Sequence, residues 1–384
     1  MHIYLNNAAT TYPKPPAVAR AMADFVERGG ANLSRGSASD RDLNSMNVVL
    51  NCREALCEFF GCEDSEFVTF TSNVTHSLNM VLKGYLRPGM RVLTTSMEHN
   101  SVTRPLRSLE AGGVEVVFIP CDDEGYLRTD DLARELAKKH TDLVVLSYAS
   151  NVCGAVQDVP AISRLCASDG VPLVLDAAQA AGHMAIDVRE LGCDALCFTG
   201  HKGLFGPQGT GGVIWKPSFA HICVPLMEGG TGSFSHEDVQ PDAMPDKFEA
   251  GTPNMPGIAG LHAALEFICA EGLENIVRRE HELGAMLLNG LREIEDITIY
   301  GPRSDRPRVP VIAMNFHDID NARAAHILST RYGIETRPGI HCSPIAHRTL
   351  GSFPQGALRL SPGYFNTDEE IEYVIRTIRT LADM

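Results

Sequence analysis

Short apolar runs alternate with amphipathic stretches between about residues 45 and 215. The runs are rich in Val, Leu, Ile and Phe, as is typical of strands buried on both faces of a sheet. The stretches between them have helical spacing, as in DLARELAKKH and PAISRLCASDG. This alternation predicts an α/β fold with a mostly parallel, doubly wound sheet of about seven strands. The predicted strands are Phe67–Thr71, Arg91–Thr95, Val114–Ile119, Leu143–Tyr148, Leu173–Asp176, Ala195–Thr199 and Gly212–Trp215.

The pattern changes after residue 228. Glu228–Asn254 is rich in Gly, Pro, Asp and Ser, which predicts a long functional loop or hairpin. One long helical segment is expected from about Gly257 to Glu293, followed by strands and helices of a smaller α+β domain. The strands and helices expected there are Val311–Phe316, Asn321–Arg331, Ala357–Leu360 and Thr367–Ala382. We therefore expect a large domain over residues 16–258 and a small domain over residues 1–15 and 259–384.

Charge and hydropathy exclude two classes of partner. Acids outnumber bases 48 to 33 over the 384 residues, and no basic run is present, so nucleic-acid binding is not expected. No apolar run approaches the ~20 residues that a membrane span needs, and the N-terminus has no signal-peptide core. We therefore expect a cytoplasmic protein that does not bind a membrane.

The chain has eleven cysteines, an odd number, and we expect them to be thiols in a reducing compartment. No CxxC pair is present, so no metal site is expected. Five cysteines in apolar runs are predicted to be inert and buried. These are Cys52, Cys57, Cys166, Cys197 and Cys269.

Polar residues follow several predicted strands, at the edge where open α/β sheets bind ligands. SNVTHSLN follows the first strand and predicts a helix N-terminus that suits a phosphate, with Thr75 and His76 as donors. An ordinary helix cap is the alternative. His99 follows the second strand and Asn151 the fourth, and each also has a purely structural interpretation.

Three further residues point to one cofactor. Asp176 ends an apolar strand and needs a cationic or hydrogen-bonding partner, and Gln179 follows three residues later. Lys202 lies in the Gly-rich bend TGHKGLFGPQGTGG, where desolvation lowers an amine pKa and favours reaction with an aldehyde. The glycines precede a strand and lack a Gly-Lys-Ser/Thr triplet, so they are only a weak nucleotide signal. Together, these groups predict that the protein binds pyridoxal 5′-phosphate, which needs a lysine, a carboxylate, an amide and a phosphate site.

These residues carry a resemblance to the fold-type I pyridoxal-phosphate enzymes of the class V aminotransferase family. Within that family the chain is most similar to cysteine desulfurases and selenocysteine lyases. The resemblance runs from YLNNAATT to LRLSPGYFNT, and its most specific segments are DAAQAAGH, FTGHKGLFGPQGTG, FEAGTPN and TRPGIHCSP. It implies the fold of the family and a homodimer with shared sites.

The resemblance also implies roles for single residues. Lys202 would bind the aldehyde and take the α-proton, Asp176 would pair with the pyridinium nitrogen, and His99 would stack on the ring and relay protons. Gln179 would bind the ring oxygen, and Thr252 would reach the phosphate in the neighbouring subunit. The implied cofactor-binding residues are Val74, Thr75, His99, Asn151, Asp176, Gln179, Thr199, His201, Lys202 and Thr252. The implied substrate-binding residues are Asn151, Arg359 and Ala8.

The segment RPGIHCSP distinguishes Cys342 from the other cysteines, because it lies in a polar loop bounded by Pro and Gly. In the desulfurases that the chain resembles, a thiolate here attacks the sulfur of the bound cysteine. The products are alanine and an enzyme persulfide, whose sulfur passes to an acceptor protein or thiol. We expect His341 to favour the thiolate form of Cys342.

Three departures from the family pattern leave the substrate open. Near the N-terminus the chain reads Leu5-Asn6-Asn7 where many relatives have an Asp. In addition, Ala38 replaces a histidine, and Ile340 stands where a second histidine is common. Cysteine, selenocysteine and cysteine sulfinate therefore remain alternatives. An aminotransferase, racemase or β-lyase that does not use Cys342 is a more distant one. A nucleotide-binding oxidoreductase or a scaffold without cofactor is more distant still.

Overall fold

The computed structural model describes residues 2–29, 39–303 and 305–383, so Ala38 lies outside the described residues. A seven-stranded sheet has the order β2-β8-β7-β6-β5-β3-β4, and it confirms the seven predicted strands. Strand β8 runs antiparallel to its neighbours β2 and β7, and the other pairs are parallel. The bounds are β2 Val68–Thr71, β3 Arg91–Thr95, β4 Glu115–Ile119, β5 Leu143–Ser147, β6 Leu173–Asp176, β7 Ala195–Thr199 and β8 Gly211–Trp215.

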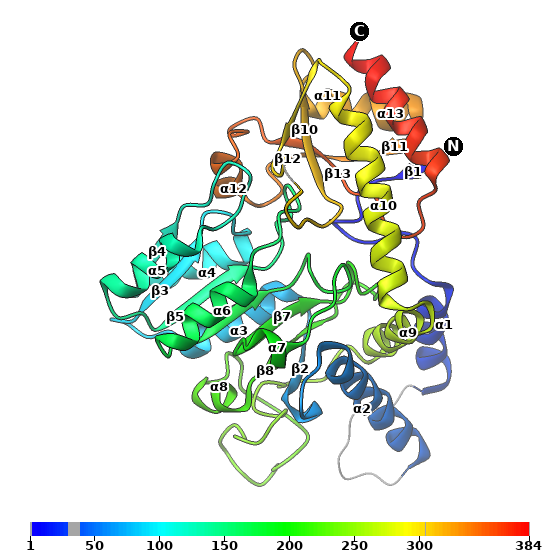
Figure 1. Ribbon diagram of the computed structural model, residues 1–384. Coiled ribbons are helices and arrows are strands. Elements are labelled where there is room, and N and C mark those ends of the chain that lie inside the picture. The colour runs from blue at the N-terminus through cyan, green and yellow to red at the C-terminus, as the bar shows by residue number, and fades with distance from the viewer. Residues whose placement is uncertain (1, 30–38, 304, 384) are drawn as a thin grey trace.

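Helices cover both faces of this sheet because its strands are apolar on both sides (Figure 1). Successive residues of a strand point to opposite faces, so Val144 and Leu146 enter one core and Val145 enters the other. The helices around the sheet are α2 Asp40–Phe60, α3 Val74–Tyr85, α4 Asn100–Ala111, α5 Thr129–Lys138, α6 Val159–Ser168, α7 Val188–Leu191, α8 Pro217–Ile222 and α9 Met255–Glu271. Helix α1 (Pro16–Asp24), followed by a π-helical turn at Phe25–Gly29, packs on α9.

A four-stranded antiparallel sheet forms a second layer, with the order β12-β13-β10-β9. Its own core is separate from the two cores of the large sheet. The N-terminal strand β1 pairs with β11, which follows α11, so the start of the chain packs with its C-terminal third. The elements here are β1 Ile3–Tyr4, β9 Ile297–Tyr300, β10 Ile312–Phe316, α11 Asn321–Tyr332, β11 Ile334–Glu335, β12 Arg337–Gly339, α12 Pro344–Thr349, β13 Ala357–Leu360 and α13 Asp368–Ala382.

The long helical segment expected over Gly257–Glu293 is helical but divided, because it forms α9 and a second helix, α10 (Leu273–Arg292). Gly272 separates the two helices with φ of 81°, a conformation that favours glycine. Helix α10 then runs from the large sheet toward the small one (Figure 1). The Gly-rich segment 228–254 has turns and bends but no helix or strand, as the loop prediction expected.

Two cysteine predictions were wrong. Cys57 and Cys62 form a disulfide, because the left-handed Gly61 at the end of α2 turns the chain back on itself. Cys269 is exposed on α9 rather than buried. The other nine cysteines, Cys269 included, are thiols.

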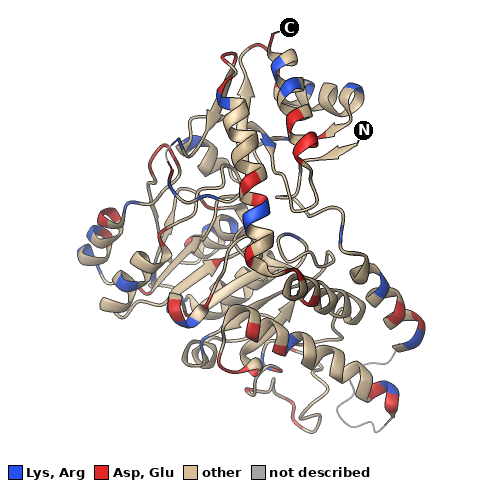
Figure 2. Cartoon of the chain, turned by 45° about the vertical axis from the view of Figure 1, so that its right-hand side comes forward, with Lys and Arg blue, Asp and Glu red and all other residues tan. Residues whose placement is uncertain are grey.

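Acidic and basic residues are interspersed over the outer helices (Figure 2). None of the helices in the described part of the chain is both long and apolar enough to cross a membrane.

Candidate active site

The carboxyl ends of the parallel strands bring Asp176 close to the start of α4. Asp176 ends β6 and is 4% exposed. Its Oδ2 accepts a hydrogen bond from Ser101 Oγ at 3.2 Å, and its Oδ1 accepts one from the backbone N–H of Ala178 at 2.9 Å. Burial raises the pKa of Asp176 despite these bonds. No described residue forms an ion pair with this carboxylate, which therefore suits a cationic ligand.

His99 is connected to Asp176 through Ser101. His99 caps α4, and its Nδ1 accepts from the backbone N–H of Ser101 at 3.0 Å and lies 2.8 Å from Ser101 Oγ. Burial and the positive charge of Lys202 lower the pKa of His99 to about 3. The ring is therefore neutral at pH 7, with Nε2 as its protonated nitrogen. A neutral, half-buried imidazole suits stacking on an aromatic ligand.

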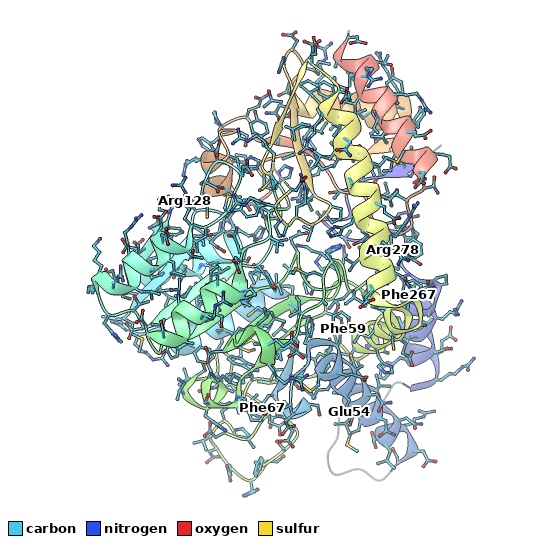
Figure 3. The ribbon with its side chains drawn as sticks, in the orientation of Figure 1. Glu54, Phe59, Phe67, Arg128, Phe267 and Arg278 are labelled. Carbon is cyan, nitrogen blue, oxygen red and sulfur yellow. A yellow bond between two sulfur atoms is a disulfide. The ribbon has the colours of Figure 1, made fainter. Side chains whose placement is uncertain are left out.

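Lys202 follows β7 in the predicted Gly-rich bend. Burial lowers the pKa of its amine to about 8, although the Asp176 carboxylate acts in the opposite direction. Phe205 anchors the same bend in an aromatic cluster with Phe267 of α9, which Figure 3 labels, and with Tyr364 and Phe365. The lysine is thus held by a rigid turn and has a substantial neutral fraction near pH 8.

The N-terminal segment also holds this bend, through one carbonyl oxygen that the sequence analysis did not consider. The carbonyl oxygen of His201 accepts hydrogen bonds from Thr10 Oγ1, from the backbone N–H and Oγ1 of Thr11 and from Lys14 Nζ, the last at 2.7 Å. Thr11 Oγ1 also donates to the carbonyl oxygen of Lys202 at 3.1 Å. Burial lowers the pKa of Lys14 to about 7. We call these three residues the N-terminal clamp.

The predicted phosphate site lies at the start of α3. Asn73 caps this helix by accepting from the N–H of His76, and the first intrahelical bond comes from Ser77. The N–H groups of Val74 and Thr75 therefore precede the hydrogen-bonded turns and are available to an anion. Two further predicted phosphate ligands lie at the end of β7: Thr199 is its last residue, and His201 follows two residues later. Thr199 is buried. Burial and the positive charge of Lys202 lower the pKa of His201 to about 4.

Gln179 joins the N-terminal segment to the site. Its Nε2 donates to the carbonyl oxygen of Ala8 at 2.9 Å, whereas its Oε1 is buried and has no hydrogen-bond partner among the described residues. The backbone N–H of Ala8 donates to Ser361 Oγ at 3.0 Å. Residues from three distant parts of the chain therefore meet here.

The predicted substrate residues are bonded to the loop that carries Cys342. Arg359 is 1% exposed, and its Nη1 donates to the carbonyl oxygen of Asn151 at 2.9 Å. Asn151 Nδ2 donates to the carbonyl oxygen of His341 at 2.8 Å, and Asn151 Oδ1 accepts from Ser343 Oγ at 2.8 Å. Cys342 lies between these two anchored residues and is exposed, with φ of 59°. The loop thus presents its thiol outward on a fixed backbone.

The expected influence of His341 on Cys342 was wrong. Both ring nitrogens of His341 face other groups: Nδ1 lies 3.2 Å from His347 Nε2, and Nε2 lies 2.9 Å from the carbonyl oxygen of Arg337. Burial and Arg359 lower the pKa of His341 to about 3. A neutral imidazole with both nitrogens engaged supports the loop and supplies no positive charge to the thiolate.

Glu98, directly before His99, is a buried group that the sequence analysis missed. It is 0% exposed. Its Oε1 lies 2.5 Å from Thr95 Oγ1, and its Oε2 accepts from the N–H and Oγ of Ser147. Burial raises the pKa of Glu98 to about 7. The signal available in the sequence was an acid inside the apolar strand end TTSMEH.

Thr252 lies apart from Lys202, in a groove of about 1170 Å³. The groove runs from Ser72 and His76 at the start of α3 to the 226–254 loop, which contributes Met227 and Thr252. Thr252 and Met227 are exposed.

The residues present fit pyridoxal phosphate. The site combines a lysine with a lowered pKa, a buried carboxylate that no described residue pairs with, and the N–H groups of a helix N-terminus. In addition, several buried polar atoms around it lack a hydrogen-bond partner in the described structure. These atoms are His76 Nε2, Gln179 Oε1, His201 Nδ1 and Arg359 Nε.

Known proteins resemble the chain over its whole length. A curated protein of Methanothermobacter thermautotrophicus named "Probable cysteine desulfurase" is 33% identical and covers 100% of this chain and 95% of its own. A "Cysteine desulfurase" of Pectobacterium atrosepticum is 32% identical, with 98% and 92% covered. The solved apo structure of the cysteine desulfurase from Thermococcus onnurineus has a TM-score of 0.92 and 32% identity, with 100% and 95% covered.

The pattern of the family described as "Aminotransferase class-V" matches residues 3–374. That range includes both sheets, the Lys202 bend and the Cys342 loop. The chain belongs to the class V aminotransferase family.

Proposed function

We propose that the protein is a pyridoxal-phosphate-dependent cysteine desulfurase, which converts L-cysteine to L-alanine and transfers the sulfur to Cys342. The observation that carries this proposal is the place of Cys342. Its exposed thiol lies on a loop that Asn151 holds by a hydrogen bond to the carbonyl oxygen of His341, and the carbonyl oxygen of Cys342 accepts from the backbone N–H of Asn100, directly after His99. A nucleophile, a basic lysine and a carboxylate-binding arginine therefore share one site. The names of the relatives support the same activity.

The chain would hold the cofactor by residues from four strand ends. Lys202 would bind its aldehyde, Asp176 its ring nitrogen, and the start of α3 with Thr199 and His201 its phosphate. His99 would cover one ring face, and Gln179 would contact the ring oxygen. Such a cofactor withdraws electrons from the substrate's α-carbon when bound. Burial keeps this chemistry away from water.

Lys202 and Arg359 have complementary tasks toward the substrate. The amine of Lys202, whose pKa is about 8, would be basic enough to take the α-proton of the substrate near neutral pH. Arg359 uses two of its nitrogens on Asn151 and Asn6, which leaves Nε and further N–H groups for a carboxylate. Asn151 then orients the arginine and the Cys342 loop together.

Cys342 would receive the sulfur. In the net step, the Cβ–S bond of cysteine breaks as the Cys342 sulfur forms an S–S bond. Cβ gains a proton to give alanine, and the enzyme holds a persulfide. No external oxidant or reductant is needed, because the substrate carbon is reduced as the two sulfurs are oxidised. An exposed thiol can then pass the sulfur to an acceptor protein.

The groove at Thr252 supports a homodimer. Its walls include exposed apolar side chains such as Leu50, Leu226 and Met227, which a second copy of the chain would cover. Thr252 would then reach the phosphate in the neighbouring subunit. Nine of the eleven cysteines are thiols, which favours a reducing, cytoplasmic location although Cys57 and Cys62 form a disulfide.

A single set of assays tests this function. The purified protein, loaded with cofactor, is incubated separately with cysteine, selenocysteine and cysteine sulfinate, and alanine is measured with sulfide, selenide or sulfite. We expect alanine from cysteine, and loss of that activity in Lys202→Ala. Formation of a keto acid from cysteine without alanine would instead indicate an aminotransferase or β-lyase.

A further inference from the structure

Arg337 and Arg359 lie directly opposite each other in the small sheet. Their Cα atoms are register partners in the antiparallel pair of β12 and β13. Residues in this relation share one face of a sheet, with Cβ atoms about 5 Å apart. Like charges in such a pair repel each other and destabilise the sheet unless an anion lies between them. The site therefore has a place for negative charge.

No acidic side chain in the described structure pairs with either arginine. Arg359 is buried, and among the described residues it bonds only to the neutral oxygens of Asn151 and Asn6, while its Nε has no partner there. The guanidinium of Arg337 forms neither a hydrogen bond nor an ion pair with any described residue. Glu335, the acid two residues before Arg337, pairs with His2 at 2.8 Å. The two arginines thus lack a counter-charge from any residue that the structure describes.

Arg337 lies close enough to Lys202 and His99 for its positive charge to act on both. This charge contributes to the lowered pKa of each residue, after the larger effect of burial. Asp176 is the carboxylate that acts on Lys202, and it is held by Ser101 at the end of β6. If Asp176 binds the ring nitrogen of the cofactor, Arg337 and Arg359 remain to bind the substrate.

We infer that Arg337 binds a negatively charged group on the substrate's β-carbon, while Arg359 binds the α-carboxylate. This inference rests on the proposed function and narrows its substrate to amino acids with an anionic β-substituent. Thiolate, selenolate and sulfinate are such groups. A free thiol has a pKa of about 8.5, and a guanidinium beside it favours the thiolate. For a sulfinate, the planar fork of arginine matches two oxygens at once.

Paired substrates separate this role from a structural one. The holoenzyme is assayed with cysteine sulfinate, whose β-group is charged, and with β-chloroalanine, whose β-group is neutral. In Arg337→Ala we expect kcat/KM to fall about 10- to 100-fold for cysteine sulfinate, the range for a lost charged hydrogen bond, and by less than about 3-fold for β-chloroalanine. Arg337→Lys should recover part of the loss. Arg331→Ala, an exposed residue of α11, is the matched control and should behave as wild type.

A binding measurement does not depend on turnover. Calorimetry on the holoenzyme compares the dianion 3-sulfopropionate with the monoanion butyrate. We expect wild type and Arg331→Ala to bind the dianion at least about 10-fold more tightly, and Arg337→Ala to bind both alike. Equal binding by wild type, or equal losses for charged and neutral substrates, would overturn the role of Arg337. Absence of alanine from cysteine in wild type would instead overturn the proposed function and leave these binding results interpretable.

Discussion

Asn151 Nδ2 donates a hydrogen bond to the carbonyl oxygen of His341 at 2.8 Å and so fixes the backbone directly before Cys342. The carbonyl oxygen of Asn151 accepts from Arg359, so the residue that orients the substrate arginine also holds the loop of the nucleophile. Binding of the substrate and presentation of the thiol are therefore coupled through one residue, which uses its backbone carbonyl oxygen for Arg359 and its side chain for the loop. Ser343 completes the connection from the other side of Cys342.

Ser343→Ala tests this coupling without removing a group that contacts the substrate. The change leaves Asn151 Oδ1 without its donor, and we expect the single-turnover rate of alanine formation to fall about 3- to 10-fold. The dissociation constant for cysteine should change little. Ser168→Ala, at an exposed position of α6, is the control. A rate equal to that of wild type would show that the Ser343 bond does not position Cys342.

Lys14→Met tests the N-terminal clamp. The lysine Nζ lies 2.7 Å from the carbonyl oxygen of His201, and its loss should loosen the Lys202 bend. We expect the cofactor to dissociate about 10-fold faster, which the decay of its absorbance after dilution would show. Lys138→Met removes an exposed lysine of α5 and should leave the rate unchanged. Equal dissociation rates in all three proteins would contradict a positioning role of the clamp.

The lowered pKa of Lys202 predicts how the cofactor-free protein captures pyridoxal phosphate. Only the neutral amine attacks an aldehyde, so the capture rate should rise with pH and reach its midpoint near pH 8. Because Asp176 raises the pKa of Lys202, Asp176→Asn should move that midpoint to lower pH. The measurement is stopped-flow absorbance across a pH series. A midpoint near 10.5, or a shift to higher pH in Asp176→Asn, would contradict the assignment.

The raised pKa of Glu98 predicts a pH-dependent stability. Its carboxyl has a pKa of about 7 in the folded chain, above its ordinary value of 4.5, so it binds a proton more tightly when folded. Its contribution to stability is therefore full below about pH 4.5 and is lost as the pH rises through 7. Glu98→Gln, which resembles the protonated form, should remove this loss. Denaturant unfolding from pH 5 to 8 should show a smaller decline in the variant, by up to about 3 kcal/mol.

A parallel decline in Glu98→Gln and wild type over that range would show that Glu98 is not the group responsible. Glu54→Gln, at an exposed position of α2, provides a variant of the same chemistry away from the site. It should follow wild type.

The sequence was sufficient for the large sheet and for the residues at its edge. Apolar runs mark strands buried on both faces, and parallel strands place Asp176, Lys202 and His99 at one edge regardless of strand order. The break between α9 and α10 was harder to predict, because Gly272 interrupts an otherwise continuous helical pattern. The Cys57–Cys62 pair depends on a local turn that residue types alone do not specify.

Contacts between distant segments could not be predicted from the sequence. Lys14 donates to a carbonyl oxygen 187 residues away, and every residue type has such a backbone acceptor, so the residue types do not indicate the contact. The opposition of Arg337 and Arg359 depends on strand register, which packing decides. His341 adjoins Cys342 in sequence, yet the positive φ of both residues turns its ring toward His347.

Alanine formation from cysteine by Cys342→Ala tests the central claim most directly. Wild type and Cys269→Ala, which removes the other exposed thiol, should form alanine and carry one additional sulfur atom on the peptide that contains Cys342. Cys342→Ala should retain the cofactor's absorbance but lose alanine formation by at least about 100-fold, as expected when the attacking nucleophile is removed. Equal alanine from Cys342→Ala and wild type would contradict sulfur transfer through Cys342.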